Sequence, residues 1–574
     1  MAKLLRINMR TKQYKFEELS DEYSKLGGRA LIAKLMINEV EPTCHPLGAE
    51  NKIIFANGLF VGTSFPCPGR LSVGGKSPLT GGIKESNVGG LAATRMGQLG
   101  LRAIVIENAP EENGLYILVI SKEKVEFFDG TVFKGLGNYA TVEKLREKWG
   151  EKIATISIGP AGEQLLAAAS VAASDLYGRP ARHAGRGGMG AVLGSKKVKA
   201  LVLLRPDEPE QDPIRDSEEF KNITREFNQI LIPKKRGMTI YGTAGMVRVA
   251  NELGGLPTQN FRVGKFDQME NISAEKLHEI ITNRGGRPTE ACSPGCVIRC
   301  SNMYVDEKGN YLTSGFEYET IAMNGSNLLI GDLDILAQID RTCDDLGLDT
   351  IEMGNAMAVA MEAGLLKWGD GAAVLALLKE VAQGTPKGKL IASGAVTVGK
   401  VLGVKRVPHC KGQGFPAYDP RVFKAMGVTF ATSPMGADHT SGPAIPGRKG
   451  WDPDKDYGDV PEARCKVELA RELQIAVSIC DAFGFCFFVG PDKWVLDYVL
   501  KILNAKYGWN WTFEDLIAYG KEILRTEHEF NKRAGVPQIN RLPDFFYAEP
   551  LPPTNNKHDI SADSLKGFQS FFLD

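Results

Sequence analysis

The sequence has no excess of either charge, no long apolar run and few cysteines. Lysine plus arginine equals aspartate plus glutamate, at 69 each in 574 residues, so no net field would draw the chain to nucleic acid or to an anionic membrane. No apolar run approaches the roughly 20 residues of a membrane span, and the first residues have the wrong order for a signal peptide. Ten cysteines are too sparse for a disulfide scaffold. We therefore expect a cytoplasmic globular protein with no membrane span and no nucleic-acid partner.

Three of these cysteines, Cys292, Cys296 and Cys300, lie within nine residues. In a reducing compartment such a group predicts a metal site rather than disulfide bonds. Iron–sulfur clusters and structural zinc both take cysteine thiolates, and both usually need a fourth ligand from a separate segment. Cys486 is the candidate, because it closes residues 481–486 (DAFGFC), which repeat the pattern of residues 344–349 (DDLGLD). Two copies of one short loop suggest that two similar groups are held.

The chain changes character near residue 205. Before it, short β-branched or apolar runs bounded by Gly, Pro and Asn predict strands; after it, helical periodicity dominates. The proline-containing linker 205–213 and the Gly- and Pro-rich stretch 411–416 are candidate domain boundaries. The prediction is an α+β protein with a sheet-rich domain 1–208 and two mainly helical domains, 209–411 and 412–574, without any short-period repeat. The expected strands are 4–7, 53–55, 103–107, 116–120, 153–158 and 200–204, and the expected helices are 333–346, 351–363, 372–381, 462–483, 493–505 and 512–531.

Two loops of the first domain have the composition of phosphate sites. Residues 179–190 combine arginines with glycines, and residues 67–90 are Gly-rich and contain Arg70 and Asn87, which can donate hydrogen bonds to phosphate oxygens. A tight structural turn and a plain surface loop are the competing interpretations. The GxGxxG run at 185–190 formally matches the dinucleotide fingerprint, which should follow a strand and open a helix. We expect a loop before it and a strand soon after it, and therefore reject the dinucleotide interpretation.

Several motifs in one order resemble a known family. The runs KSPLTG (76–81), SNVGG (86–90) and AGRGGMGAVLGSK (184–196), the three cysteines and the two Asp-x-x-Gly loops together resemble the tungsten-dependent aldehyde:ferredoxin oxidoreductase family over nearly the whole chain. The resemblance implies a sheet-rich first domain forming a base under a tungsten ion chelated by the dithiolenes of two pterins. Two mainly helical domains would close over this bis-pterin cofactor, and the metal would take no protein ligand. The pterin pair could hold molybdenum instead.

The resemblance also implies which residues hold each group. Each Asp-x-x-Gly loop would hydrogen-bond one pterin, a magnesium ion (Mg2+) would bridge the pterin phosphates, and four cysteines would bind a [4Fe–4S] cluster beside the second pterin. The implied phosphate and magnesium residues are Arg70, Asn87, Gly89, Arg182, His183 and Gly185; the pterin residues are Asp344, Leu348 and Asp349 in the first loop and Asp481 and the Cys486–Phe487 backbone in the second; the cluster ligands are Cys292, Cys296, Cys300 and Cys486.

Two residues match the family's active-site pair. Glu319 lies in residues 315–320 (GFEYET), where Glu317 and Glu319 share a face only if the chain is extended. His439 lies in a Gly-rich loop, where a lone histidine would ordinarily be exposed or locally hydrogen-bonded; histidine titrates where a neutral-pH proton shuttle must. The resemblance implies that an activated water attacks the carbonyl carbon of an aldehyde and yields the carboxylic acid. His439 would polarise the carbonyl, and Glu319 would orient or deprotonate the water.

Two departures from the family pattern bear on partners. Cys292 and Cys296 are separated by three residues, where members such as the archaeal aldehyde enzyme have two. Gln338 and Arg341 stand where that enzyme has a Glu-x-x-His pair that ligates an iron between two subunits, so we expect no bridging iron, although the protein could still be oligomeric. The expected electron acceptor is a ferredoxin or a ferredoxin-like subunit.

Two other functions stay open. The same family includes tungsten enzymes that reduce aromatic-ring thioesters, and such a catalytic subunit would need a pocket deep enough for the thioester tail. From a different class, the cysteines could hold structural zinc in a non-redox protein.

Overall fold

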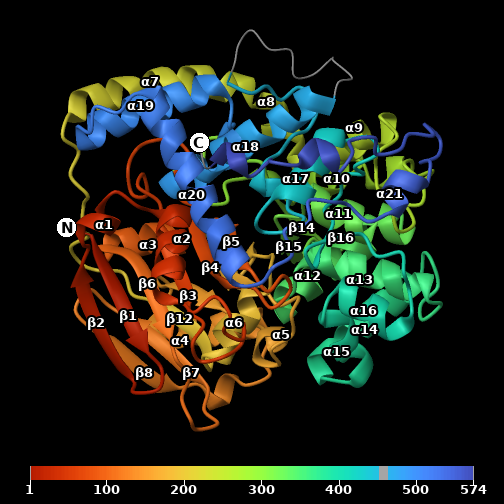
Figure 1. Ribbon diagram of the computed structural model, residues 1–574. Helices are drawn as coiled ribbons and strands as arrows, with labels where there is room; N and C mark the ends of the chain where they lie inside the picture. Colours follow the sequence, from red (N-terminus) through yellow and green to blue (C-terminus); the bar gives the residue numbers. More distant parts are fainter. Residues whose placement is uncertain (1, 452–462, 573–574) are drawn as a thin grey trace.

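Two six-stranded sheets occupy residues 3–203 of the computed structural model, which describes residues 2–451 and 463–572 of the chain (Figure 1). All six predicted strands are confirmed, and the other six strands of these two sheets were not predicted. The strands of the first sheet are β1 (Lys3–Asn8), β2 (Gln13–Glu18), β3 (Ile53–Asn57), β4 (Leu71–Lys76), β5 (Ile83–Val88) and β6 (Leu101–Glu107), and those of the second are β7 (Tyr116–Ile120), β8 (Val125–Asp129), β9 (Ala154–Ser157), β10 (Val171–Ala173), β11 (Arg182–Ala184) and β12 (Val198–Leu203).

The two sheets have the same topology. Their strand orders are β2-β1-β6-β3-β4-β5 and β8-β7-β12-β9-β10-β11, so adding six to each strand number of the first sheet gives the order of the second. In the first sheet β1 runs parallel to β6 and every other neighbouring pair is antiparallel; in the second, β7 and β12 form the parallel pair. The first part of the chain is therefore a structural duplication, although its sequence shows no short-period repeat.

Alternating side chains of the buried strands pack in two directions. In β3, Ile53 and Phe55 contribute to the core that the two sheets share, whereas Ile54 packs with α2 (Gly28–Glu39) on the other side. The second sheet repeats this arrangement, because alternate residues of β7 pack in the shared core and against α4 (Asn138–Trp149). Strands buried on both faces lack a polar face. The first part is thus a sandwich in which α3 (Ala92–Gln98) and α6 (Met189–Ser195) lie in the core between the two sheets and one further helix packs outside each sheet.

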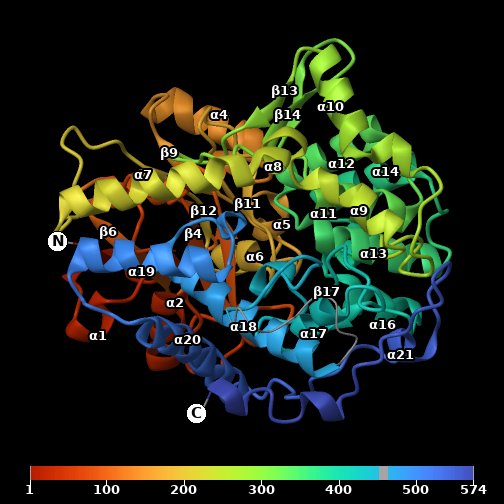
Figure 2. The same ribbon diagram turned by 90° about the horizontal axis from the view of Figure 1, so that it is seen from above.

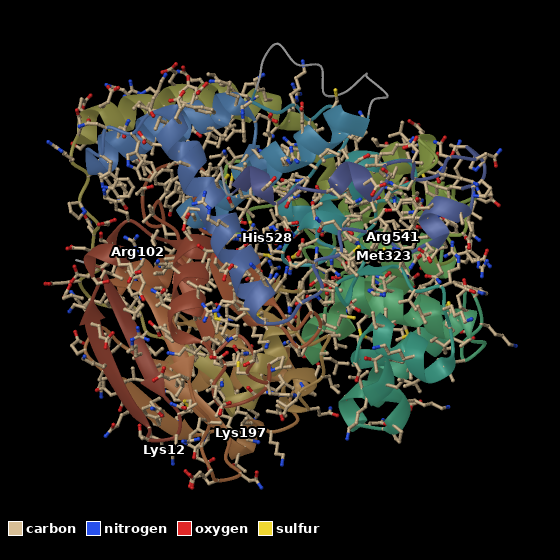
Figure 3. The ribbon with its side chains drawn as sticks, viewed as in Figure 1. Lys12, Arg102, Lys197, Met323, His528 and Arg541 are labelled. Atoms are coloured by element: carbon tan, nitrogen blue, oxygen red, sulfur yellow. The ribbon has the colours of Figure 1, made fainter. Side chains whose placement is uncertain are left out.

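The rest of the chain is mainly helical, and all six predicted helices are confirmed. Only residue 462 of the predicted helix 462–483 lies outside the described residues. Met323 is fully buried within this helical part (Figure 3). Among the described helices, none combines the length and hydrophobicity that a bilayer span requires. The division into three domains stays a prediction.

The remaining elements complete the fold. The other helices of the first part are α1 (Asp21–Ser24), α3 (Ala92–Gln98), α5 (Pro160–Glu163) and α6 (Met189–Ser195). The later helices are α7 (Ser217–Lys234), α8 (Arg236–Tyr241), α9 (Met246–Glu252), α10 (Ala274–Asn283), α11 (Tyr318–Asn324), α12 (Leu333–Leu346), α13 (Thr350–Glu362), α14 (Gly371–Gln383), α15 (Pro386–Ala392), α16 (Ala395–Leu402), α17 (Lys424–Thr432), α18 (Ala463–Phe483), α19 (Lys493–Tyr507), α20 (Phe513–Arg533) and α21 (Phe545–Ala548). The small sheets contain β13 (Arg287–Glu290), β14 (Ser301–Val305) and β15 (Tyr311–Ser314), and β16 (His409–Cys410) and β17 (Gln413–Gly414).

Each Asp-x-x-Gly loop stops a helix at the boundary with the first domain. Gly347 has a φ of 69° and ends α12, and Gly484 has a φ of 76° just after α18; this left-handed backbone favours glycine. The side chain of Asp349 then accepts a hydrogen bond from the N–H of Ile351 and caps the start of α13. The loop sequence therefore fixes where the helices end and where their polar residues lie.

Candidate active site

Every residue predicted to bind a cofactor, ligate a metal or act in catalysis lines one cavity of about 290 Å³. The cavity lies between the sheet-rich first part and the helical part, so segments hundreds of residues apart in the chain meet there. The structure thus brings the predicted residues together, while their individual roles stay predictions. Those residues are Arg70, Asn87, Gly89, Arg182, His183, Gly185, Cys292, Cys296, Cys300, Glu319, Asp344, Leu348, Asp349, His439, Asp481, Cys486 and Phe487.

The first half of the duplication contributes Arg70, Asn87 and Gly89 to the cavity. The guanidinium of Arg70 donates hydrogen bonds to the side-chain and backbone oxygens of Asn87. A Cβ at Gly89 would lie 3.1 Å from Arg70 Nη1 and 3.3 Å from Cys292 Sγ, so glycine leaves room for the cysteine loop to approach. The next residue, Gly90, donates its N–H to the carbonyl of Cys292 at 3.0 Å. This edge of the cavity therefore places a cation beside the first cysteine.

The second half contributes Arg182, His183 and Gly185. Arg182 is buried, yet its Nε and Nη2 have no hydrogen-bond partner among the described residues, and Glu290 Oε2 lies 3.8 Å from Nη2, too far for a hydrogen bond. Leaving a buried guanidinium unsatisfied is costly, so a phosphate or another anion fits this place. A Cβ at Gly185 would meet nothing within 4 Å. Burial lowers the pKa of His183 to about 4, so its imidazole can form hydrogen bonds in the neutral state. Its Nε2 lies 3.2 Å from Asp344 Oδ1.

The prediction for the surroundings of the GxGxxG run is wrong. A short strand, β11, precedes the run, and a helix, α6, follows it. Every residue of α6 is buried, so its sequence lacks the polar face that usually marks a helix. The dinucleotide interpretation still fails, because β10 and β9 separate β11 from β12 and the segment is not a parallel βαβ unit.

Each Asp-x-x-Gly loop packs on the equivalent place in one half of the duplication. A Cβ at Gly159, just after β9, would lie 2.3 Å from the backbone of the first loop, next to Gly347. A Cβ at Gly58, just after β3, would lie 2.1 Å from the backbone nitrogen of Gly484 in the second loop. Because β3 and β9 occupy the same position in their sheets, the two loops are held alike. This arrangement suits a ligand made of two similar parts.

The four cysteines line the cavity without converging on one point. All are free thiols, and no group of three or more His, Cys, Asp or Glu side chains in the described part of the chain could hold a single metal ion. Burial raises the pKa of Cys486 to about 12, and a hydrogen bond with Cys296 together with burial raises the pKa of Cys292. These thiols would therefore lose their protons on binding a metal. Four cysteine thiolates can bind an iron–sulfur cluster or a structural zinc ion, so the cluster assignment stays a prediction.

Glu319 and His439 face each other across the cavity. Glu319 lies in the first turn of α11, and His439 begins a 3-10 turn, so the pair joins two distant segments. His439 Nε2 lies 3.6 Å from Glu319 Oε1, while Glu319 Oε2 accepts the N–H of Ala417 at 2.8 Å. Glu319 Oε1 and His439 Nδ1 are buried and have no hydrogen-bond partner among the described residues. Burial raises the pKa of Glu319, which makes it a stronger base than an exposed carboxylate.

A buried ion pair and a buried arginine that the sequence analysis missed hold the loop of His439. Lys84 Nζ lies 2.5 Å from Asp438 Oδ2, and both side chains are buried. Burial alone would raise the pKa of Asp438, but Lys84, Arg186 and His439 together lower it far below its usual value. Arg186 also donates to the carbonyl of Ala437 at 2.7 Å. The available signals were that Asp438 adjoins His439 and that Arg186 lies inside the Gly-rich run.

Two further carboxylates line the cavity. Glu317 has an extended backbone just before α11, and Glu319 lies in the first turn of that helix. Both side chains line the cavity, although the segment is extended only at Glu317. Burial raises the pKa of Asp340 to about 7, and its Oδ2 accepts the hydroxyl of Thr313 at 2.6 Å. The cavity wall therefore carries acids with raised proton affinity besides Glu319.

The positions that would hold a bridging iron are used differently. Gln338 is exposed on α12. Arg341 donates to the carbonyl of Leu312 at 3.0 Å and lies 3.3 Å from the ring centroid of Tyr139. The absence of a bridging iron stays a prediction.

Comparison with known proteins points to one family. Residues 4–205 match the family model described as aldehyde ferredoxin oxidoreductase, N-terminal domain, and residues 218–570 match the one described as aldehyde ferredoxin oxidoreductase, domains 2 & 3. The tungsten-containing aldehyde ferredoxin oxidoreductase of Pyrococcus furiosus is 33% identical, over 97% of this chain and 93% of its own, and the protein of the same name from Thermococcus kodakarensis gives the same values. The aliphatic sulfonate oxidoreductase WOR-like subunit of Pyrococcus furiosus is 28% identical, over 88% of this chain and 85% of its own.

A solved structure has the same fold. It is the active site complex BamBC of benzoyl coenzyme A reductase with 1,5 dienoyl-CoA, which aligns with a TM-score of 0.83 over 99% of this chain and 94% of its own, at 20% identity. The predicted fold class is confirmed.

Proposed function

Because the chain belongs to the aldehyde ferredoxin oxidoreductase family, we propose that it is a tungsten-pterin enzyme that oxidises aldehydes to carboxylic acids. One observation carries the proposal: a single cavity is lined both by the Glu319–His439 pair and by the four predicted cluster cysteines. A bound bis-pterin tungsten centre would supply the two-electron oxidation, and a [4Fe–4S] cluster would release the electrons singly.

The residues present fit such a cofactor. Arg182 offers two buried and unsatisfied N–H groups to a phosphate oxygen, and Arg70 and Asn87 would hold the other phosphate and the magnesium ion. Asp344 and Asp481 would hydrogen-bond one pterin each. Burial raises the pKa of both carboxyls, so each could donate a proton in a hydrogen bond to a ring atom.

Glu319 and His439 would manage the protons of the reaction. Glu319 Oε1, which has no hydrogen-bond partner among the described residues, would take a proton from the attacking water. His439 would hydrogen-bond the carbonyl oxygen and carry a proton outward. One aldehyde and one water give one carboxylate, three protons and two electrons. Two ferredoxin molecules would accept one electron each. The reducing cytoplasm, where free thiols persist, is part of the same proposal.

The test is an anaerobic assay of the purified holoenzyme with a viologen dye as acceptor. Aliphatic and aromatic aldehydes should each be tried, and the carboxylate should form in proportion to the dye reduced. Failure to form carboxylate from any aldehyde, with tungsten and iron present, would refute the proposal. Reduction of an aromatic thioester by the same preparation, with reduced dye as the electron donor, would instead support the reductase alternative. The likeness to benzoyl coenzyme A reductase concerns the fold alone and does not decide between the two reactions.

A further inference from the structure

We propose that the surface around α8 is the docking site of a small acidic iron–sulfur protein of ferredoxin type. The inference rests on the proposed function, because it assigns the exit of the electrons. Seen from above, α7 and α8 lie on the near face of the molecule, beside β13 and β14, whose connection carries the cysteines (Figure 2). We define the α8 surface by the apolar residues Ile232, Ile240 and Tyr241 and the cations Lys234, Arg236 and Arg299.

The α8 surface adjoins the cysteine loop, residues 291–300. The hydroxyl of Thr239 in α8 donates to the carbonyl of Ile298 at 2.7 Å. A Cβ at Gly242, directly after α8, would lie 2.7 Å from the carbonyl oxygen of Cys300. Arg299 is exposed, and Cys296 is half-buried beside it. The cysteine loop therefore reaches solvent next to α8. Electron tunnelling falls steeply with distance, so an acceptor is expected to bind here.

Exposed apolar side chains are concentrated between residues 232 and 253, a stretch that contains α8. Ile232, Ile240 and Tyr241 are 50%, 37% and 42% exposed, and Val249 and Leu253 follow at 43% and 42%. Ten large apolar side chains are exposed in the described part of the chain, and five of them lie between residues 232 and 253. Scattered single residues of this kind are ordinary, whereas a local group of them marks an interaction surface.

The cations of the α8 surface have no counter-charge of their own. Lys234, Arg236 and Arg299 form no ion pair with any carboxylate that the structure describes, and Lys234 only lies 5.8 Å from the ring centroid of Trp494. Asp492, a carboxylate close to this region, is already paired with Arg448 at 3.3 Å. The surface is therefore locally positive although the whole chain has no net charge. Complementary charge favours an acidic partner and speeds its association.

A second copy of the chain fits this surface less well. Its own α8 surface is equally positive, and like charges facing each other oppose symmetric docking. A small protein of net negative charge that carries a one-electron centre matches both the charge and the position over the cysteines.

The experiment uses the double variant Lys234→Glu/Arg236→Glu of the holoenzyme, because both residues lie outside the cysteine loop. Binding of a purified acidic ferredoxin is measured on a biosensor, and ferredoxin reduction is compared with viologen reduction under aldehyde. We expect the Kd and the KM for ferredoxin to rise by about tenfold or more, with unchanged viologen activity and cluster absorbance. The wild-type Kd should also rise with ionic strength, and that of the variant should change little.

The matched control reverses two exposed lysines far from α8, Lys379→Glu/Lys387→Glu, which changes the net charge equally. It should bind ferredoxin as the wild type does. Equal ferredoxin binding by the α8 variant and the wild type, or equal loss in the control, would overturn the inference. Wild-type protein that binds ferredoxin through this surface but oxidises no aldehyde would refute the proposed reaction and leave the docking site standing, so the two failures are distinguishable.

Discussion

Replacing Glu319 with glutamine tests the proposed proton path most sharply. The change preserves the shape of the side chain, and the amide oxygen can still accept the N–H of Ala417, which Glu319 Oε2 accepts at 2.8 Å. It removes the base, Oε1, which is buried and faces His439 Nε2 at 3.6 Å. A positioned acid or base contributes about 100- to 10,000-fold to a rate, which corresponds to about 3–5 kcal/mol of activation free energy. Glu319→Gln should therefore lose that much kcat while keeping its tungsten and iron.

The partner of Glu319 should behave in the same way. His439→Asn can still donate a hydrogen bond but cannot hold a proton in transit, so its kcat should fall by a similar factor. Because the two side chains act on one proton path, the kcat of the double variant should be only slightly below that of the less active single variant. Rates are measured anaerobically with a saturating viologen dye, after the metal content of each protein has been determined. Near-normal turnover of every aldehyde by both single variants would refute the mechanism.

The pH dependence follows from the burial of Glu319. Burial raises its pKa, and the reaction needs its deprotonated form, so kcat/KM should fall as the pH drops through that raised value. The decline should begin at a higher pH than an exposed glutamate, with a pKa of about 4.3, would give. Glu319→Gln should flatten this acid limb. An unchanged acid limb in the variant would show that another group controls it.

Three further predictions concern the supports of the site. Cys486→Ser should lose or convert the [4Fe–4S] signal in electron paramagnetic resonance, whereas Cys465→Ser should not; equal effects would sink the ligand assignment. Arg182→Ala should lower pterin and tungsten content, because a charge-assisted hydrogen bond contributes about 1.5–3 kcal/mol; full content would count against the phosphate role. Lys84→Met should lower the midpoint of thermal inactivation, because breaking a buried ion pair costs about 3–5 kcal/mol, and adding Asp438→Asn should recover most of the loss; no recovery would show that the pair is not the cause.

The regular elements could be predicted where their local pattern is strong. β7 is a continuous apolar run, β12 is apolar except for Lys199, and α12 alternates buried and exposed residues with a helical period. β4 contains two glycines, and β10 and β11 have three residues each, so neither composition nor length distinguishes them from loops. Their existence depends on pairing with strands distant in sequence.

The candidate site was predictable as separate motifs, because each motif has a local chemical reason for its residues. The contacts between motifs were not. Lys84 and Asp438 lie 354 positions apart in the chain, and no local periodicity relates them. The duplication of the two sheets is likewise a property of strand order and not of sequence repeats.

Elemental analysis of the purified holoenzyme tests the central claim most directly. Protein prepared anaerobically from cells supplied with both tungstate and molybdate should contain iron sufficient for one [4Fe–4S] cluster and a pterin-bound tungsten, or molybdenum in its place, in each chain. A colourless protein with stoichiometric zinc and neither iron nor tungsten nor molybdenum would contradict the account.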